Sequence, residues 1–328
     1  MGMMVVAVGC GYPDLPRLMG GDAADAAADG PPQALSCMGL ATTCGPGAND
    51  DCCRVGAVTG GTFYRGHDST GTYPDMAYPA TLSDYKLDVY EVTVGRFRAF
   101  VNAGLGTQAS PPAAEAGAHP QIAGSGWNTE WNTALVAKTT DLVSRVKCNA
   151  MYQAWTDGAG GNENKAMNCV TWYEAMAFCI WDGGYLPTDA EWNYAASGGD
   201  EQRAYPWSIP PGSTTIDCTY ANFFINSPSG TFCVNGTGGI NRVGTPNGNG
   251  RWKQADLAGN VNEWILDWDA GSHPVPCNDC ANLTPGSDRV LRGGSFTNMA
   301  SDLRVASRDH NLPVIRLYDV GFRCARTL

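Results

Sequence analysis

The spacing of apolar residues predicts three short helices in a chain that is otherwise irregular. Apolar side chains recur at helical intervals over residues 94–101, after Thr93, which can cap a helix, and before Gly104, which can end one. A second apolar face lies near residues 172–182. A third helix is predicted over residues 188–199, where Thr-Asp-Ala-Glu has the residues of a capping box and two glycines close the segment.

The rest of the chain offers short strands and long loops. Residues 105–166 are rich in Gly, Ala, Asn and Pro, with Trp127 and Trp131 as expected anchors. Strand patterns are brief, as at 289–292 and 320–324. The 328 residues include 41 Gly and 20 Pro, which favours many turns. We therefore predict a mixed α+β fold that is loop-rich, with short strands and few helices.

The N-terminal region changes composition before the main domain begins. Residues 1–10 form a short apolar run ending at Cys10, similar to the end of a bacterial lipoprotein signal peptide, whose cysteine is lipidated after cleavage. This partial signal peptide lacks a basic start, so the translation start is expected upstream; the alternative is a cytoplasmic start with a chance cysteine. Residues 11–36 are interpreted as a flexible Ala/Asp/Gly/Pro linker, 37–56 as a Cys-rich segment and 57–328 as the main domain.

The charge balance narrows the classes of partner. The formal net charge is −11, from 21 Lys and Arg against 32 Asp and Glu. No basic run is present, which argues against a nucleic-acid partner. Beyond the N-terminal run, no stretch reaches the ~18 apolar residues of a membrane-spanning helix. Membrane contact is therefore expected only through a lipid anchor on Cys10.

Cysteine usage indicates the compartment. Thirteen cysteines in an acidic, loop-rich chain indicate an oxidising environment and disulfide bonds. We expect an exported protein of the cell envelope, lipid-anchored or secreted. The four histidines are far apart, so no zinc-binding spacing is present. Three pairings remain open for the four cysteines of the Cys-rich segment, Cys37, Cys44, Cys52 and Cys53.

Nine short motifs follow one another along the main domain. They are GGTFYRG (60–66), DVYEVT (88–93), NCVTW (168–172), LPTDAEW (186–192), YPW (205–207), YAN (220–222), DLAGNVNEW (256–264), RGGSF (292–296) and GFRCA (321–325). In this order they resemble the formylglycine-generating enzyme, or sulfatase-modifying factor, family over residues 57–328. The resemblance implies that family's variant of the C-type lectin fold.

The resemblance also implies how cysteines pair. A family disulfide between the second helix and the final strand corresponds to Cys179–Cys324. A second family disulfide would fall at Ala196 and Val305, so both of its partners are absent together. Cys277-Asn-Asp-Cys280 could be redox-active or bind a soft metal, but its Pro- and Asn-rich loop favours a loop-closing disulfide. The expected local pairs, which leave Cys10 over, are Cys218–Cys233, Cys277–Cys280 and Cys148–Cys169.

The family binds calcium in the loop that contains Gly-Asn-x-x-Glu-Trp. By position, Asp256 and Glu263 would supply carboxylate oxygens, and Gly259 and Val261 backbone carbonyls, a donor set that suits a hard cation. The alternative is an acidic surface turn packed by Trp264. A second family calcium site would use Asn222 and the backbone of Phe223, although its acidic partner is not evident here.

The family's redox chemistry is not expected in this chain. Active members bind copper through two cysteines, five residues apart, just after Gly-Gly-Ser, and oxidise a sulfatase cysteine to formylglycine. Here Asn298 aligns with the first of these cysteines and the second has no counterpart. Neither Asn298 nor Met299 can replace a thiolate pair.

The groove that follows Gly-Gly-Ser remains a candidate binding surface. Its arginines can pair with a carboxylate or with peptide carbonyls, or they can hold loops against acidic neighbours. The groove candidates are Ser295, Asn298, Arg304, Arg308, His310 and Tyr318. The acidic pairs Asp88/Glu91 and Asp189/Glu191 are assigned simpler roles at helix starts.

These observations favour a calcium-stabilised, non-catalytic member of the family, a pseudoenzyme with an accessory binding role at the cell surface. Its ligand would be a protein or peptide in the groove, such as a sulfatase. One alternative is an oxidoreductase that uses a different centre, although an iron site needs clustered His or carboxylates. Another is a lectin-fold ligand-display module, with residues 296–319 as the display region.

Overall fold

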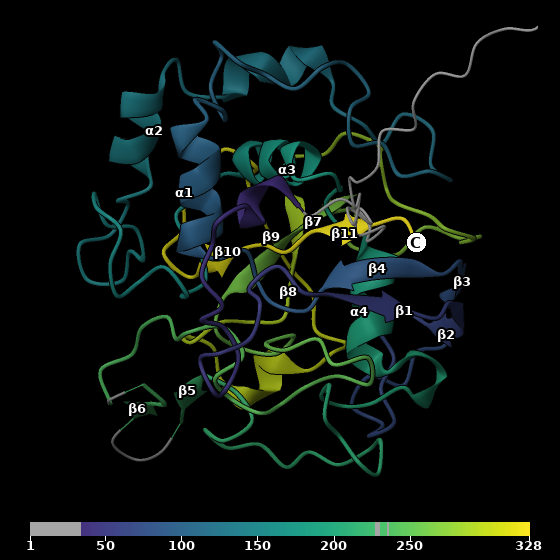
Figure 1. Ribbon diagram of the computed structural model, residues 1–328. Coiled ribbons are helices and arrows are strands. Elements are labelled where there is room, and N and C mark those ends of the chain that lie inside the picture. Colours follow the sequence, from purple (N-terminus) through teal and green to yellow (C-terminus); the bar gives the residue numbers. More distant parts are fainter. Residues whose placement is uncertain (1–33, 227–229, 235) are drawn as a thin grey trace, which may run out of the picture. The chain divides into compact units, whose positions relative to one another are not determined.

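The computed structural model describes residues 34–226, 230–234 and 236–328, and their ribbon is shown in Figure 1. The predicted signal with Cys10, and the predicted linker as far as residue 33, lie outside the described residues. Ser36, which the sequence analysis placed in the linker, is buried, so the compact unit includes the last residues of the predicted linker. No helix in the described part is both long and apolar enough to cross a membrane.

The three predicted helices are present, each with the expected start. The Thr93 side chain accepts a hydrogen bond from Arg96 N, and complete capping boxes begin at Thr171 and Thr188. The third helix ends at Gly198, whose φ of 68° is the left-handed conformation that glycine favours. The described residues contain four α-helices: α1 Val94–Asn102, α2 Thr139–Arg145, α3 Trp172–Trp181 and α4 Asp189–Ser197.

The long excursion at 105–166 is held by tryptophans, as predicted. Trp127 is fully buried, and its ring meets Trp131 edge-on at a centroid distance of 5.5 Å. Trp131 in turn contacts Trp172 of α3 at 5.2 Å. The excursion contains more regular structure than predicted, namely η2 Thr129–Ala134 and α2.

The strands are short and form four small sheets in the described residues. A three-stranded sheet has the order β1-β4-β11, a four-stranded sheet has the order β10-β7-β8-β9, and β2-β3 and β5-β6 are two-stranded. The bounds are β1 Val55–Val58, β2 Gly61–Tyr64, β3 Pro79–Leu82, β4 Tyr85–Asp88, β5 Phe224–Ile225, β6 Thr231–Phe232, β7 Asn262–Trp268, β8 Arg289–Arg292, β9 Asp309–Asn311, β10 Val320–Gly321 and β11 Ala325–Arg326. The predicted mixed α+β, loop-rich fold is confirmed.

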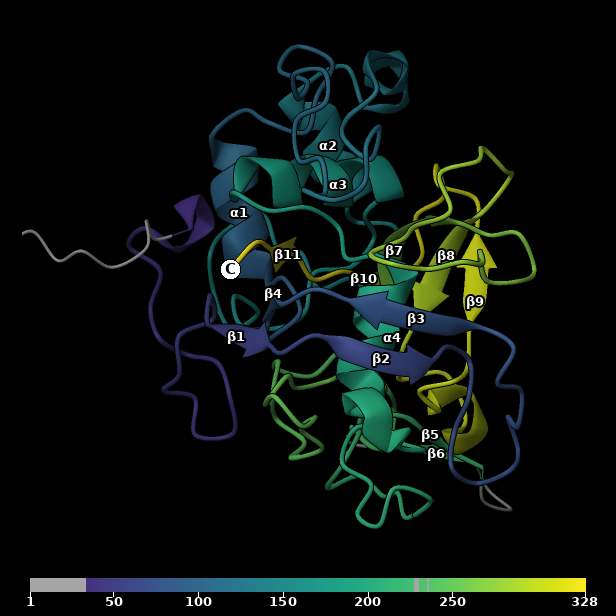
Figure 2. The same cartoon turned by 90° about the vertical axis from the view of Figure 1, so that its right-hand side faces the viewer.

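Strand β7 is the centre of the domain. Every one of its residues is buried, and both α3 and α4 contact it. Figures 1 and 2 show α1, α2 and α3 gathered at one end of the domain and the β5–β6 hairpin at the other. β10 runs parallel to β7, and β8 runs antiparallel to it. The starts of β7 and β10 and the end of β8 therefore meet at one edge, where the loop after Gly-Gly-Ser begins.

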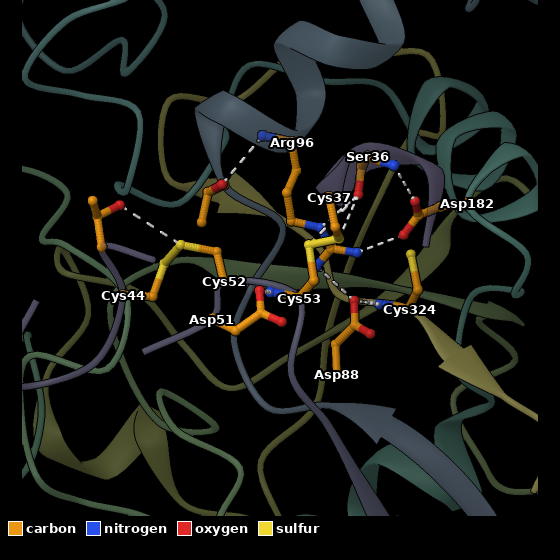
Figure 3. The surroundings of a disulfide bond; sticks show 12 residues. Ser36, Cys37, Cys44, Asp51, Cys52, Cys53, Asp88, Arg96, Asp182 and Cys324 are labelled. Atoms are coloured by element: carbon orange, nitrogen blue, oxygen red, sulfur yellow. Dashed lines mark hydrogen bonds and ion pairs between the residues drawn. A yellow bond between two sulfur atoms is a disulfide. The ribbon is translucent and has the colours of Figure 1, made fainter. Parts of the chain in front are cut away.

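The Cys-rich segment is joined to the main domain rather than separate from it (Figure 3). Its cysteines pair as Cys37–Cys53 and Cys44–Cys52, which settles the open connectivity. Ser36 N donates to Asp182 at 2.8 Å, and the Arg96 guanidinium donates to Ser36 Oγ at 3.0 Å. The same guanidinium binds Asp88 and Asp182 at 2.9 and 2.7 Å, so the segment rests on a buried ion-pair network.

Candidate functional site

Asn298, which the resemblance aligns with the first copper cysteine of the family, has its side-chain oxygen engaged by neighbouring residues. Asn298 Oδ1 accepts hydrogen bonds from Ser295 N at 3.0 Å and from Ser295 Oγ at 2.8 Å. It also accepts a longer bond, 3.3 Å, from Asn262 Nδ2 at the start of β7. This oxygen therefore acts as the acceptor that fixes the turn after Gly-Gly-Ser.

Ser295 is fully buried. Its hydroxyl belongs to a hydrogen-bond network with Thr297 and Asp319. Its Oγ contacts Thr297 Oγ1 at 2.8 Å and Asp319 Oδ2 at 3.2 Å, and Thr297 donates to the same carboxylate at 3.0 Å. No histidine contacts Ser295 among the described residues. The network explains how the turn is held and gives no arrangement for nucleophilic catalysis.

Two adjoining pockets open beside this turn. The groove pocket, about 210 Å³, is lined by Asn262, Leu291, Arg292, Gly293, Gly294, Asn298, Asp302, Ser307, Arg308 and Asp309. The histidine pocket, about 410 Å³, is lined by Arg65, Gly66, Asp75, Tyr78, Asp269, Gly271, Ser272, His273, Ala306, Arg308 and His310. Arg308 lines both, so the predicted candidates Asn298, Arg308 and His310 are brought together along one face.

Arg304 differs from the other predicted groove residues. Its guanidinium binds Asp68 at 3.0 Å and Thr70 Oγ1 at 2.6 Å, and it lines neither pocket. The alternative role, holding a loop against an acidic neighbour, is the one that the structure shows for Arg304.

Tyr318 belongs to an aromatic cluster near the groove. Its ring lies 5.4 Å from Tyr152 and 6.3 Å from Phe296, measured between centroids. Tyr152 and Phe296 are 5.2 Å apart. The sequence analysis did not place Tyr152 in this aromatic cluster, because Tyr152 lies in the long irregular segment 105–166. The Cys148–Cys169 disulfide and the fold bring that part of the segment beside Tyr318.

All twelve cysteines within the described residues form disulfides. The four predicted pairs are present: Cys148–Cys169, Cys179–Cys324, Cys218–Cys233 and Cys277–Cys280. At the position of the second family disulfide, Ala196 and Val305 are fully buried in one apolar cluster. No thiol is therefore available to bind copper in the part of the chain that the structure describes.

The predicted calcium loop places several oxygen atoms without hydrogen-bond donors. The carbonyls of Gly259 and Val261 accept no hydrogen bond from the described residues, and Asp256 uses only Oδ2, which accepts from Gly244 N. Glu263 is different: Arg323 binds both of its oxygens, at 2.6 and 2.7 Å, and Trp192 Nε1 donates to it at 2.9 Å. Three of the four predicted ligands thus have a free oxygen, and the fourth is shared with a cation.

Glu91 is a carboxylate of this region that the sequence analysis placed elsewhere. It is buried, and it accepts hydrogen bonds from Asn260 Nδ2 at 2.6 Å and Val261 N at 3.2 Å, so its assignment as a simple helix-start residue was wrong. Burial, together with Asp256 and Glu263, raises the pKa of Glu91 well above its usual value. Burial also raises the pKa of Asp256 to about 6. Arg323 forms its ion pair with Glu263, while Glu91 and Asp256 act on it only as nearby charges, so burial favours the neutral forms of these two carboxyl groups.

The other helix-start assignments had mixed outcomes. Glu191 closes the capping box of α4, as predicted. Asp88 instead forms an ion pair with Arg96, which Figure 3 shows, and another with Arg326. Asp189 binds the buried Arg292 at 2.5 Å, so it has a tertiary partner as well as a place in the first turn.

The second predicted calcium site adjoins the same loop, because Asn222 contacts Asn260 through its side chain and its backbone carbonyl. Asn222 Oδ1 is buried and has no hydrogen-bond partner in the structure. Asn222 Nδ2 donates to Asn260 Oδ1 at 3.1 Å, and the Phe223 carbonyl accepts from Cys233 N at 3.2 Å. Only the Asn222 side-chain oxygen is left without a partner there.

Comparisons with known proteins agree with the motifs. The model for the sulfatase-modifying factor enzyme 1-like domain matches residues 44–328. The formylglycine-generating enzyme of Thermomonospora curvata is 32% identical over 304 aligned residues, with 82% of this chain and 92% of that protein covered. The inactive C-alpha-formylglycine-generating enzyme 2 of Bos taurus is 32% identical over 163 residues, 48% of each chain. The structure of PvdO from Pseudomonas aeruginosa is similar in fold, with a TM-score of 0.55 at 20% identity, covering 84% of this chain and 94% of that one.

Proposed function

Because this chain belongs to the sulfatase-modifying factor family, we propose that it binds a ligand in the family groove without oxidising a cysteine. The observation that carries the proposal is that no pair of free cysteine thiols is present in the described residues. Asn298 stands in place of the first copper cysteine, and every cysteine in the described residues is in a disulfide. Copper(I) prefers thiolate ligands, and no such pair is offered.

A turnover experiment tests this proposal. The purified protein is incubated with copper, oxygen and a peptide that carries Cys-x-Pro-x-Arg, and the peptide is examined by mass spectrometry. We expect the cysteine to stay unchanged, while the Thermomonospora curvata relative serves as the positive control. Conversion of the cysteine to an aldehyde would contradict the proposal, and stoichiometric copper or iron in the purified protein would favour an oxidoreductase with another centre.

The groove supports binding of a protein or peptide ligand. Asn262 and Asn298 offer amide groups and Arg308 a guanidinium within one pocket, and an aromatic cluster with Tyr318 lies near it. Polar groups placed beside aromatic rings are typical of ligand-binding sites. Sulfatases are one class of partner that the family name brings into consideration.

We also propose that calcium stabilises the Asp256–Glu263 loop. Asp256, Gly259 and Val261 would hold the ion through oxygens that lack donors, and Glu263 would be shared with Arg323. A divalent cation would favour the ionised forms of Glu91 and Asp256, whose pKa values are raised by burial. This ion would be structural, since a hard cation with oxygen ligands organises a loop.

Six disulfides support export into an oxidising compartment. We propose a cell-envelope location, with a lipid on Cys10 as the membrane anchor.

A further inference from the structure

The histidine pocket has guanidinium groups whose hydrogen-bonding capacity is only partly used. Arg65 is 1% exposed, and its Nη1 and Nη2 donate to Cys280 Sγ and to the Pro274 carbonyl, but its Nε has no acceptor. Arg308 Nη1 donates to Asp269 at 2.5 Å, whereas Arg308 Nε also has no acceptor. Unpaired buried donors are costly, so a ligand in the pocket that supplies acceptor atoms would be favoured.

The buried carboxylate beneath the pocket is already shared by several donors. Asp189 lies 2.5 Å from Arg292 Nε, 3.0 Å from His273 Nδ1 and 3.3 Å from Arg308 Nε, and the last two contacts lack hydrogen-bond geometry. Burial alone would raise the pKa of Asp189, but Arg292, His273 and Arg308 hold it well below its usual value. The ionised form of Asp189 is thus favoured, and among its neighbours it accepts a side-chain hydrogen bond from Arg292.

Other carboxylates do not supply the missing acceptors. Asp267 accepts hydrogen bonds from Asp189 N and Asn282 N, at 2.8 and 2.7 Å, and so faces the backbone. Asp75, on the pocket lining, accepts from Ala77 N at 2.8 Å at an exposed site. Arg292 adds a third unpaired donor, Nη2, on the side of the groove pocket. The unpaired buried side-chain atoms of this cluster are all nitrogen.

We propose that the histidine pocket binds an oxyanion, a carboxylate, phosphate or sulfate group, through Arg308 and Arg65. A planar guanidinium presents its N–H groups as a fork that fits two oxygens of such a group. His273 and His310 on the lining add ring nitrogens at its side. The inference rests on the proposed binding function and names the ligand class: an anionic group adjoining the groove through the shared Arg308.

Calorimetry with simple anions tests this inference on the full chain. Sodium phosphate, sodium sulfate and sodium glutarate are titrated separately, with sodium chloride at matched ionic strength as the reference. We expect saturable binding of at least one anion, and the preferred one identifies the oxyanion. Arg308→Ala should weaken it at least tenfold, and Arg308→Lys, which keeps the charge but loses the fork, should weaken it less. Arg304→Ala, outside both pockets, is the control and should bind like the parent protein.

A second measurement uses the parent protein alone, so it does not depend on a substitution that could disturb folding. In the parent protein, the NMR signals of the Nε–H groups of Arg65 and Arg308 should move on addition of the bound anion. The inference is overturned if none of the three anions binds saturably, or if binding is the same in Arg308→Ala. If no anion binds, the anion site is rejected while the proposed function, which the turnover experiment tests, is unaffected. If the peptide is oxidised but the anion still binds, only the proposed function is rejected.

Discussion

Arg323 and its carboxylate neighbours show how much of a site can be inferred from single positions. Asp256, Gly259, Val261 and Glu263 were identified from motif order. Glu91 was not, because it lies far away in sequence and its place before a helix had a sufficient local explanation. Only the fold brings its carboxylate to Val261 N. Local sequence rules therefore point to candidate residues on one loop and miss neighbouring side chains that a distant segment contributes.

Removal of calcium should destabilise the domain. A ligand that binds only the folded state adds RT ln(1 + [L]/Kd), about 2.7 kcal/mol at a hundredfold excess over Kd. We expect EDTA to lower the midpoint of thermal unfolding, calcium to restore it and Asp256→Ala to abolish the difference. Asp141→Ala, on α2, should keep the response. Equal midpoints with and without calcium in the parent protein would contradict the calcium proposal.

At the scale of elements, helices were easier to predict than strands for a physical reason. A cap is a local hydrogen bond, so Thr93 and Thr188 could be recognised from their immediate neighbours. Strand β7 is buried along its whole length, so the alternation that marks a half-exposed strand is absent and the sequence analysis did not identify it, whereas the strand predicted at 289–292 is confirmed as β8. The strand predicted at 320–324 is present only in part, because β10 covers Val320–Gly321.

Loss of the α4 cap should be measurable as a loss of stability. The Thr188 side chain accepts from Glu191 N, and Glu191 returns a hydrogen bond to Thr188 N at 2.8 Å. Thr188→Ala is expected to lower the free energy of unfolding by about 1 kcal/mol in urea titrations. Lys138→Ala is the matched control, because Lys138 occupies the N-cap of α2 without a side-chain cap. An equal effect of the two substitutions would show that the cap is not the cause.

At the scale of the whole molecule, the fold and the groove followed from motif order, but the N-terminal attachment did not. The four cysteines of the Cys-rich segment allowed three pairings, because spacing alone does not decide among them. In the folded protein the neighbouring Ser36 contacts Asp182, at the end of α3, and Arg96, in α1. Such contacts depend on the assembled domain, so no pattern within residues 37–56 reveals them.

Each disulfide should stabilise the folded protein by an amount that depends on the length of the loop that it closes. Cys179–Cys324 spans 145 residues and Cys44–Cys52 spans 8. Loop-closure entropy then predicts losses of about 5 and about 2.5 kcal/mol when each pair is replaced by alanines. Guanidinium titrations of Cys179→Ala/Cys324→Ala and Cys44→Ala/Cys52→Ala would measure the difference. A larger loss for the short loop would show that contacts at the N-terminal segment, rather than restriction of the unfolded chain, dominate the contribution of these bonds.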